Sequence, residues 1–168
     1  MNFKQKRQKM RKRFEQQLRI GQISIQDADI DLKSRDYYVA LMRALKEIFI
    51  SPEYNKEIFR VLEEKILLGK KATGRRGMDL WQIFVLAQVR LALNIGYDRL
   101  HTMANHDSLL RQVMGIETEF GYEKQKIGYQ QILDNISLLD DETVKQINNV
   151  ILEIGHQVFK KKRRKHCA

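Results

Sequence analysis

Apolar residues recur along most of the chain at the three- and four-residue spacing of amphipathic helices. This spacing predicts a first helix from about Arg35 to Phe49, capped by Ser34, and a second that restarts at Ser51-Pro52-Glu53 and ends near Gly69. The sequence has one proline and nine glycines, and few runs of alternating β-branched residues. It therefore predicts an all-α helical bundle.

The most apolar part of the chain, residues 78–116, is predicted to form three consecutive helices around which the rest packs. The first is capped by Asp79, ends near a left-handed Gly96 and is apolar on nearly every side, as is typical of a central helix. The second covers about residues 97–104, and the third begins near Asp107 and stops at Gly115. This succession is the outline of a helix-turn-helix unit.

Two further helices are expected after this unit, a short one around Tyr129 to Ile136 and a long one capped by Asp140. The long helix has apolar residues at the a/d spacing of a coiled-coil seam, but over only two heptads. Packing on its own domain is the preferred interpretation, and pairing with another subunit is the alternative. The seam consists of Val144, Ile147, Ile151, Ile154 and Val158.

These elements divide the chain into four parts. Residues 1–33 would combine a basic helix with an extended linker laid on the surface. Residues 34–116 would form a helical domain, with the helix-turn-helix-like unit at 78–116. Residues 117–159 would form a C-terminal helical extension, and residues 160–168 a basic tail.

The formal net charge of +10 is unevenly distributed. Residues 1–19 hold eight Lys/Arg against a single Glu, and residues 160–165 are six consecutive cations. Residues 65–76 add five cations without an acid, in a glycine-spaced loop. Such clusters favour a polyanionic partner, because each neutralised phosphate releases condensed counterions. An acidic membrane surface is the competing interpretation of the N-terminus.

Double-stranded DNA is the partner that these clusters suit best. Arginine and asparagine can pair with guanine and adenine edges, and arginine in a flexible loop can enter a minor groove or clamp phosphate. We expect four residues of the short helices to line the groove-facing side, namely Arg99, Asn105, His106 and Arg111. We expect four loop residues on the DNA backbone or in the minor groove, namely Lys70, Lys71, Arg75 and Arg76; the alternative is a solvated connection.

No catalytic, metal or cofactor site is predicted. The segment GKKATGRRG lacks the spacing of a P-loop and its Lys-Ser/Thr pair. His101 and His106 are five residues apart and so do not share a helical face, and the single cysteine, Cys167, supports neither a disulfide framework nor a thiolate metal site. No secretion signal or membrane span is recognisable, so a soluble, cytoplasmic protein is expected.

Four segments carry a resemblance to a known family: MRKRFEQQLRIGQISI, LKEIFISPEYNKEIFRVLEEKI, GMDLWQIFVLAQVRLALNIGYDRLHTMANHDSLLRQVMGIE and YQQILDNISLLDDETVKQINNVILEIGHQVFKKK. From about Met10 to Lys161 the chain resembles the N-terminal part of bacterial insertion-sequence transposases of the ISNCY or InsH-like type. The resemblance implies a helical region that binds the terminal inverted repeats of the element. The DDE catalytic domain of that family would follow, and this chain is expected to stop before it.

The resulting hypothesis is a DNA-binding N-terminal fragment of a transposase without strand-transfer activity of its own. An interaction module that regulates intact transposase by hetero-oligomerisation is the first alternative, with a second copy or full-length transposase as partner. A stand-alone helix-turn-helix repressor and a gene remnant without a role are the others.

Overall fold

The computed structural model describes residue 14 and residues 20–68, 77–119 and 124–166, with side chains up to Glu153 in the last range. The described residues form seven α-helices and one 3-10 turn, and no strand beyond a single bridge between Gln22 and Thr118. The elements are η1 (Ile25–Asp27), α1 (Tyr37–Ile50), α2 (Pro52–Ile66), α3 (Leu80–Leu93), α4 (Tyr97–His106), α5 (Ser108–Val113), α6 (Tyr129–Ile136) and α7 (Asp141–His166). The expected all-α bundle is confirmed.

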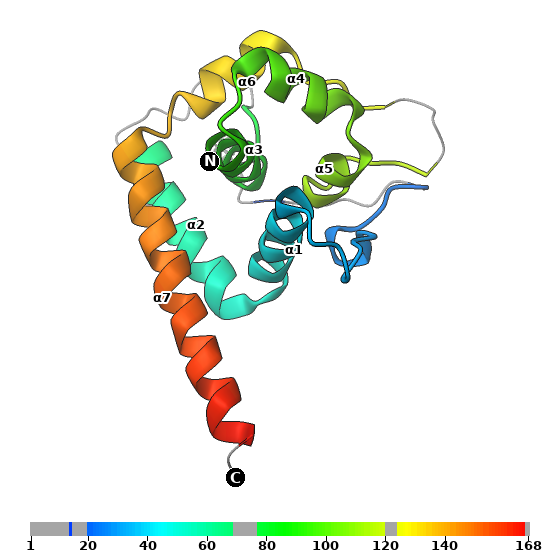
Figure 1. Cartoon of the computed structure of the whole chain (residues 1–168). Helices are drawn as coiled ribbons and strands as arrows, with labels where there is room; N and C mark the ends of the chain where they lie inside the picture. Colours follow the sequence, from blue (N-terminus) through cyan, green and yellow to red (C-terminus); the bar gives the residue numbers. More distant parts are fainter. Residues whose placement is uncertain (1–13, 15–19, 69–76, 120–123, 167–168) are drawn as a thin grey trace, which may run out of the picture.

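Helix α3 is the centre of the body, as its apolar circumference predicts. It contacts α1, α2, α4 and α6, which surround it in Figure 1. Every residue from Leu80 to Val89 is buried, the two glutamines included. The Nε1–H of Trp81 donates to the carbonyl of Val113 at 2.9 Å, so α5 is tied to this centre as well.

Some helix ends follow the sequence signals and others differ. Ser51 precedes Pro52 at the start of α2, and the carboxylate of Asp107 caps α5 by accepting from Leu110 N at 2.8 Å, both as expected. Helix α1 begins later than predicted, because the carboxylate of Asp36 accepts from Tyr38 N at 2.7 Å and takes the capping place assigned to Ser34.

The turn between α3 and α4 is also made differently from the prediction. Asn94, with φ 50°, is the left-handed residue that ends α3, and Gly96 has an ordinary φ of −76° and begins α4. Asparagine tolerates this region better than most side chains, so the structure does not need the glycine there.

The segment from Gly21 to Lys33 is part of the body, which corrects the prediction of a linker laid on the surface. Ile25 is completely buried, and Ala28 and Ile30 are buried beside it. The backbone of the segment bonds to residues 117–119, through Ile23 N to Glu117 O at 3.0 Å and Glu119 N to Gly21 O at 2.7 Å. Three apolar side chains of the segment are therefore in the core, and two backbone bonds attach it to residues 117–119.

Helix α7 starts after Asp140, whose carboxylate accepts from Thr143 N at 2.7 Å, as expected. Its first part packs on α2, with Ile147 fully buried and Val144 8% exposed, so the beginning of the apolar seam is used within the chain. The helix then continues to His166 and projects past the rest of the body (Figure 1). Most of the predicted basic tail is therefore helical. None of the helices in the described ranges is long and apolar enough to cross a membrane.

Candidate nucleic-acid interface

The four predicted loop contacts, Lys70, Lys71, Arg75 and Arg76, lie outside the described residues. Their contact with DNA stays a prediction that rests on the charge of the loop.

Two predicted contacts, Arg99 and His106, lie on α4 and are exposed. Seven residues separate them, which is close to two helical turns, so they share one face of the helix. Thr102 lies between them and is exposed too. The face that these three residues form is open to a partner.

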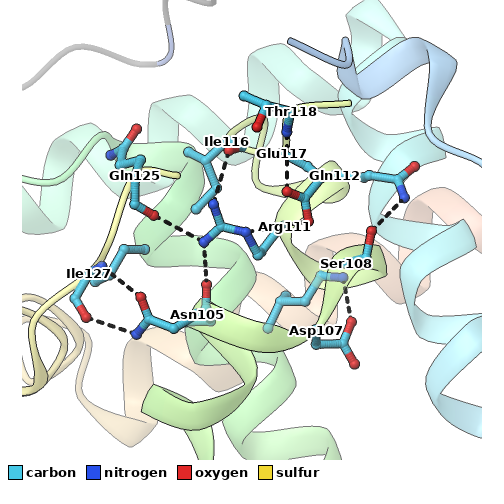
Figure 2. A network of polar contacts seen from close by, with 12 residues as sticks. Asn105, Asp107, Ser108, Arg111, Gln112, Ile116, Glu117, Thr118, Gln125 and Ile127 are labelled. Atoms are coloured by element: carbon cyan, nitrogen blue, oxygen red, sulfur yellow. Dashed lines mark hydrogen bonds and ion pairs between the residues drawn. The ribbon is translucent and has the colours of Figure 1, made fainter. Parts of the chain in front are cut away.

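Arg111 is not at the surface, which corrects the expectation that it faces a DNA groove. Its side chain is 1% exposed. Nη1 donates to the carbonyls of Ala104 and Gln125, both at 3.0 Å, and Nη2 donates to the carbonyl of Ile116 at 3.2 Å (Figure 2). The guanidinium therefore collects the carbonyls of three separate chain segments and has no approach to a base.

The charge of Arg111 is balanced inside the protein by Glu117. Nε of Arg111 lies 3.4 Å from Oε2 of Glu117, and the two side chains are 1% and 5% exposed. Glu117 also accepts from Thr118 N at 3.1 Å. A buried guanidinium needs such a partner, because transfer of an unpaired charge from water into the interior is costly.

Asn105 is likewise engaged within the chain rather than turned to a DNA groove. Its Oδ1 accepts from Ile127 N and its Nδ2 donates to Ile127 O, both at 2.9 Å, and Nδ2 also donates to His101 O at 2.9 Å (Figure 2). Both ends of the amide are therefore used by backbone groups. The paired donor and acceptor that would recognise an adenine edge recognise a peptide group of this chain instead.

Together, Asn105 and Arg111 fix an extended segment beside α4, and this segment presents two cations that the sequence analysis did not single out. Lys124 and Lys126 are exposed on either side of Gln125, and Ile127 is buried. The sequence signal is the run Lys124-Gln125-Lys126 before Ile127, three polar residues that are all exposed. Lys124 and Lys126 thus add two exposed cations in a segment beside α4, in addition to Arg99 on the helix itself.

The described body as a whole is acidic. Residues 20–68, 77–119 and 124–153 contain 13 Lys/Arg and 19 Asp/Glu. The excess of positive charge therefore comes from residues 1–19, 69–76 and 160–165. The last of these clusters is on the projecting end of α7.

His101 packs edge-to-face on Tyr129, with ring centroids 5.9 Å apart, as an ordinary partly buried residue. Among the described residues, no group of three or more His, Cys, Asp or Glu is placed to hold a metal ion.

No protein-family model, no curated protein and no solved structure matches the chain.

Proposed function

We propose that the protein binds double-stranded DNA, mainly through phosphate contacts, as the DNA-binding N-terminal region of an insertion-sequence transposase. The observation that carries the DNA-binding proposal is the separation of charge. A compact acidic body bears three strongly cationic segments, at residues 1–19, 69–76 and 160–165. An acidic body repels DNA except where these segments reach it, so they determine where and in which orientation DNA is held.

The end of α7 supports phosphate contact rather than base reading. A helix rises about 1.5 Å per residue, so the 26 residues of α7 extend about 39 Å and the 15 residues of α2 about 22 Å. Residues 160–165 are six consecutive cations at the far end of this helix. Lysine and arginine at this density suit the charged phosphate backbone of DNA.

Fewer residues are available to recognise a DNA sequence than the amino-acid sequence suggested. Asn105 and Arg111 are used internally, so among the described residues of the short helices Arg99 is left as the side chain that could pair with a guanine. The transposase assignment is motivated by the resemblance of the four quoted segments. It implies preference for the ends of the element over other DNA.

The test is binding of labelled duplex from the ends of the encoding element, with random-sequence duplex as competitor, over a series of salt concentrations. The logarithm of the affinity should fall linearly with the logarithm of the salt concentration. Changing the six cations of residues 160–165 to Gln should reduce the slope by up to about 5, because each phosphate contact contributes about 0.9.

A matched control is the change of Lys33, Arg35, Lys56 and Lys145 to Gln, four exposed cations of the body, which should reduce the slope much less. Absence of any salt slope would overturn the phosphate contacts. Equal affinity for element ends and random DNA would overturn the specific recognition that a transposase region requires.

A further inference from the structure

Phe14 is the first residue that the structure describes, and its ring packs on the body. The ring centroids of Phe14 and Phe49 are 5.6 Å apart with an interplanar angle of 85°, an edge-to-face contact. Phe49 in turn packs on Trp81 with centroids 4.9 Å apart. Phe14 is therefore the outermost ring of an aromatic row that leads to the central helix.

The place that receives this ring depends on Gly115. Gly115 has φ +73°, and a Cβ atom there would overlap the ring of Phe14 and lie 3.3 Å from Cδ1 of Ile25. Gln22 fixes the position of Gly115 by donating Nε2–H to its carbonyl at 2.7 Å. Gly115, Ile25 and Phe49 thus form a socket, which we call the Phe14 socket, open only because residue 115 has no side chain.

The sequence directly before Phe14 is strongly cationic. Seven Lys/Arg lie between Lys4 and Arg13, in residues 1–13, which we call the arm. Phe14 is partly buried against the core, and the apolar surface that its ring removes from water favours the position in the socket.

We propose that Phe14 anchors the arm to the body, so that the arm reaches DNA as a tethered second contact instead of a loosely attached tail. This inference rests on the proposed function. With the ring in the socket, Arg13 is one residue from a fixed point. Without it, the next residue toward the C-terminus that is bonded to the body, within the part of the chain that the structure describes, is Gly21, eight residues away, whose carbonyl accepts from Glu119 N. Effective concentration falls roughly as the −3/2 power of tether length, so the loss of affinity can reach about 20-fold.

The deciding experiment is a double-mutant cycle in the full-length chain, measured as affinity for random-sequence duplex DNA at low salt. One change is Phe14→Ala, and the other replaces the seven Lys/Arg of the arm with Gln. We expect Phe14→Ala to weaken binding about 5- to 20-fold in the natural chain and to have almost no effect once the arm is neutral. Phe14→Leu should restore part of the affinity. Equal weakening in both backgrounds would mean that Phe14 only stabilises the body, and would overturn the proposal.

Limited trypsin digestion without DNA separates the anchor from the DNA contact. Cleavage after Arg13 and Arg19, on either side of Phe14, should be faster in Phe14→Ala than in the natural chain. Equal cleavage rates would show that the ring does not hold the arm, whatever the DNA result. A difference in cleavage combined with no DNA binding at all would retain the anchor and overturn both the proposed function and the role of the arm in it.

Discussion

Nε of Arg111 lies 3.4 Å from Oε2 of Glu117, and both side chains are buried. Around this pair the guanidinium bonds to the carbonyls of Ala104, Ile116 and Gln125. One side chain therefore joins the end of α4, the turn after α5 and the segment that leads to α6. Arg111 was expected to touch DNA, and here it determines the shape of the body instead.

Replacing Arg111 with Met should destabilise the fold by about 3–5 kcal/mol, because Glu117 would be left as a buried, unpaired charge. Urea unfolding measures this directly. The double change Arg111→Met with Glu117→Leu should recover part of the loss, since it leaves no buried charge. If the Arg111→Met variant kept its stability and lost affinity for DNA, Arg111 would have to face a DNA groove after all.

Asn105→Ala should cost about 2 kcal/mol of stability, because the N–H and C=O of Ile127 lose their partners together. Asn105→Asp is the informative companion, since a carboxylate still accepts from Ile127 N and no longer donates to Ile127 O. We expect it to be destabilised as well. The affinity of both variants for DNA, measured on protein that remains folded, should be nearly the same as that of the natural chain. A selective loss of affinity for element ends would contradict this.

Arg99→Gln and His106→Gln should affect DNA binding and not the fold. Both residues are exposed, and surface substitutions of this kind change stability by about 0.5 kcal/mol or less. If Arg99 contacts a phosphate, its loss should lower the salt slope by about 1 for every DNA sequence. If Arg99 instead reads a guanine, its loss should remove the preference for guanine at one position of the DNA. Lys56→Gln on α2 is the control for the loss of one exposed cation.

Stability should decline in alkaline solution because of Tyr38. Burial raises the pKa of its hydroxyl above the ordinary value of 10.0, and the hydrogen bond to Oδ1 of Asp107, at 2.8 Å, raises this pKa further. The fold therefore prefers the neutral phenol, while the unfolded chain ionises near pH 10. The contribution of Tyr38 to the free energy of unfolding is complete below that pH and is lost as the pH rises beyond it.

Tyr38→Phe should be about 1 kcal/mol less stable at neutral pH and should show a shallower decline above pH 10, in urea titrations at a series of pH values. An identical alkaline decline in both proteins would exclude Tyr38 as its cause.

Local signals in the sequence were enough to predict where most of the helices lie. The span of α6 agrees with its prediction, the restart at Ser51-Pro52 is confirmed, and the apolar circumference of α3 identified the central helix. Each of these features depends on residues within one or two helical turns. Helix ends were less well predicted where two neighbouring residues could each cap the helix, as Asp36 and Ser34 could at the start of α1.

The surface was harder to predict because it depends on contacts between distant residues. Arg111 was expected on the groove-facing side of the short helices, but the carbonyls that hold it come from residues 104, 116 and 125. Asn105 is bonded to Ile127, 22 positions away. One signal was present: Arg111 and Glu117 are isolated charges in the otherwise largely apolar segment LLRQVMGIE, where a buried pair is a reasonable expectation.

Trp81 is the only tryptophan in the sequence, and its indole is fully buried and bonded to Val113 O. Its fluorescence consequently reports from a single place, the middle of the body. A shift of its emission to longer wavelength signals that water has reached α3. Changes confined to the projecting end of α7 should leave the emission as it was. The chain thus carries an intrinsic probe that distinguishes damage to its core from alterations at its cationic ends.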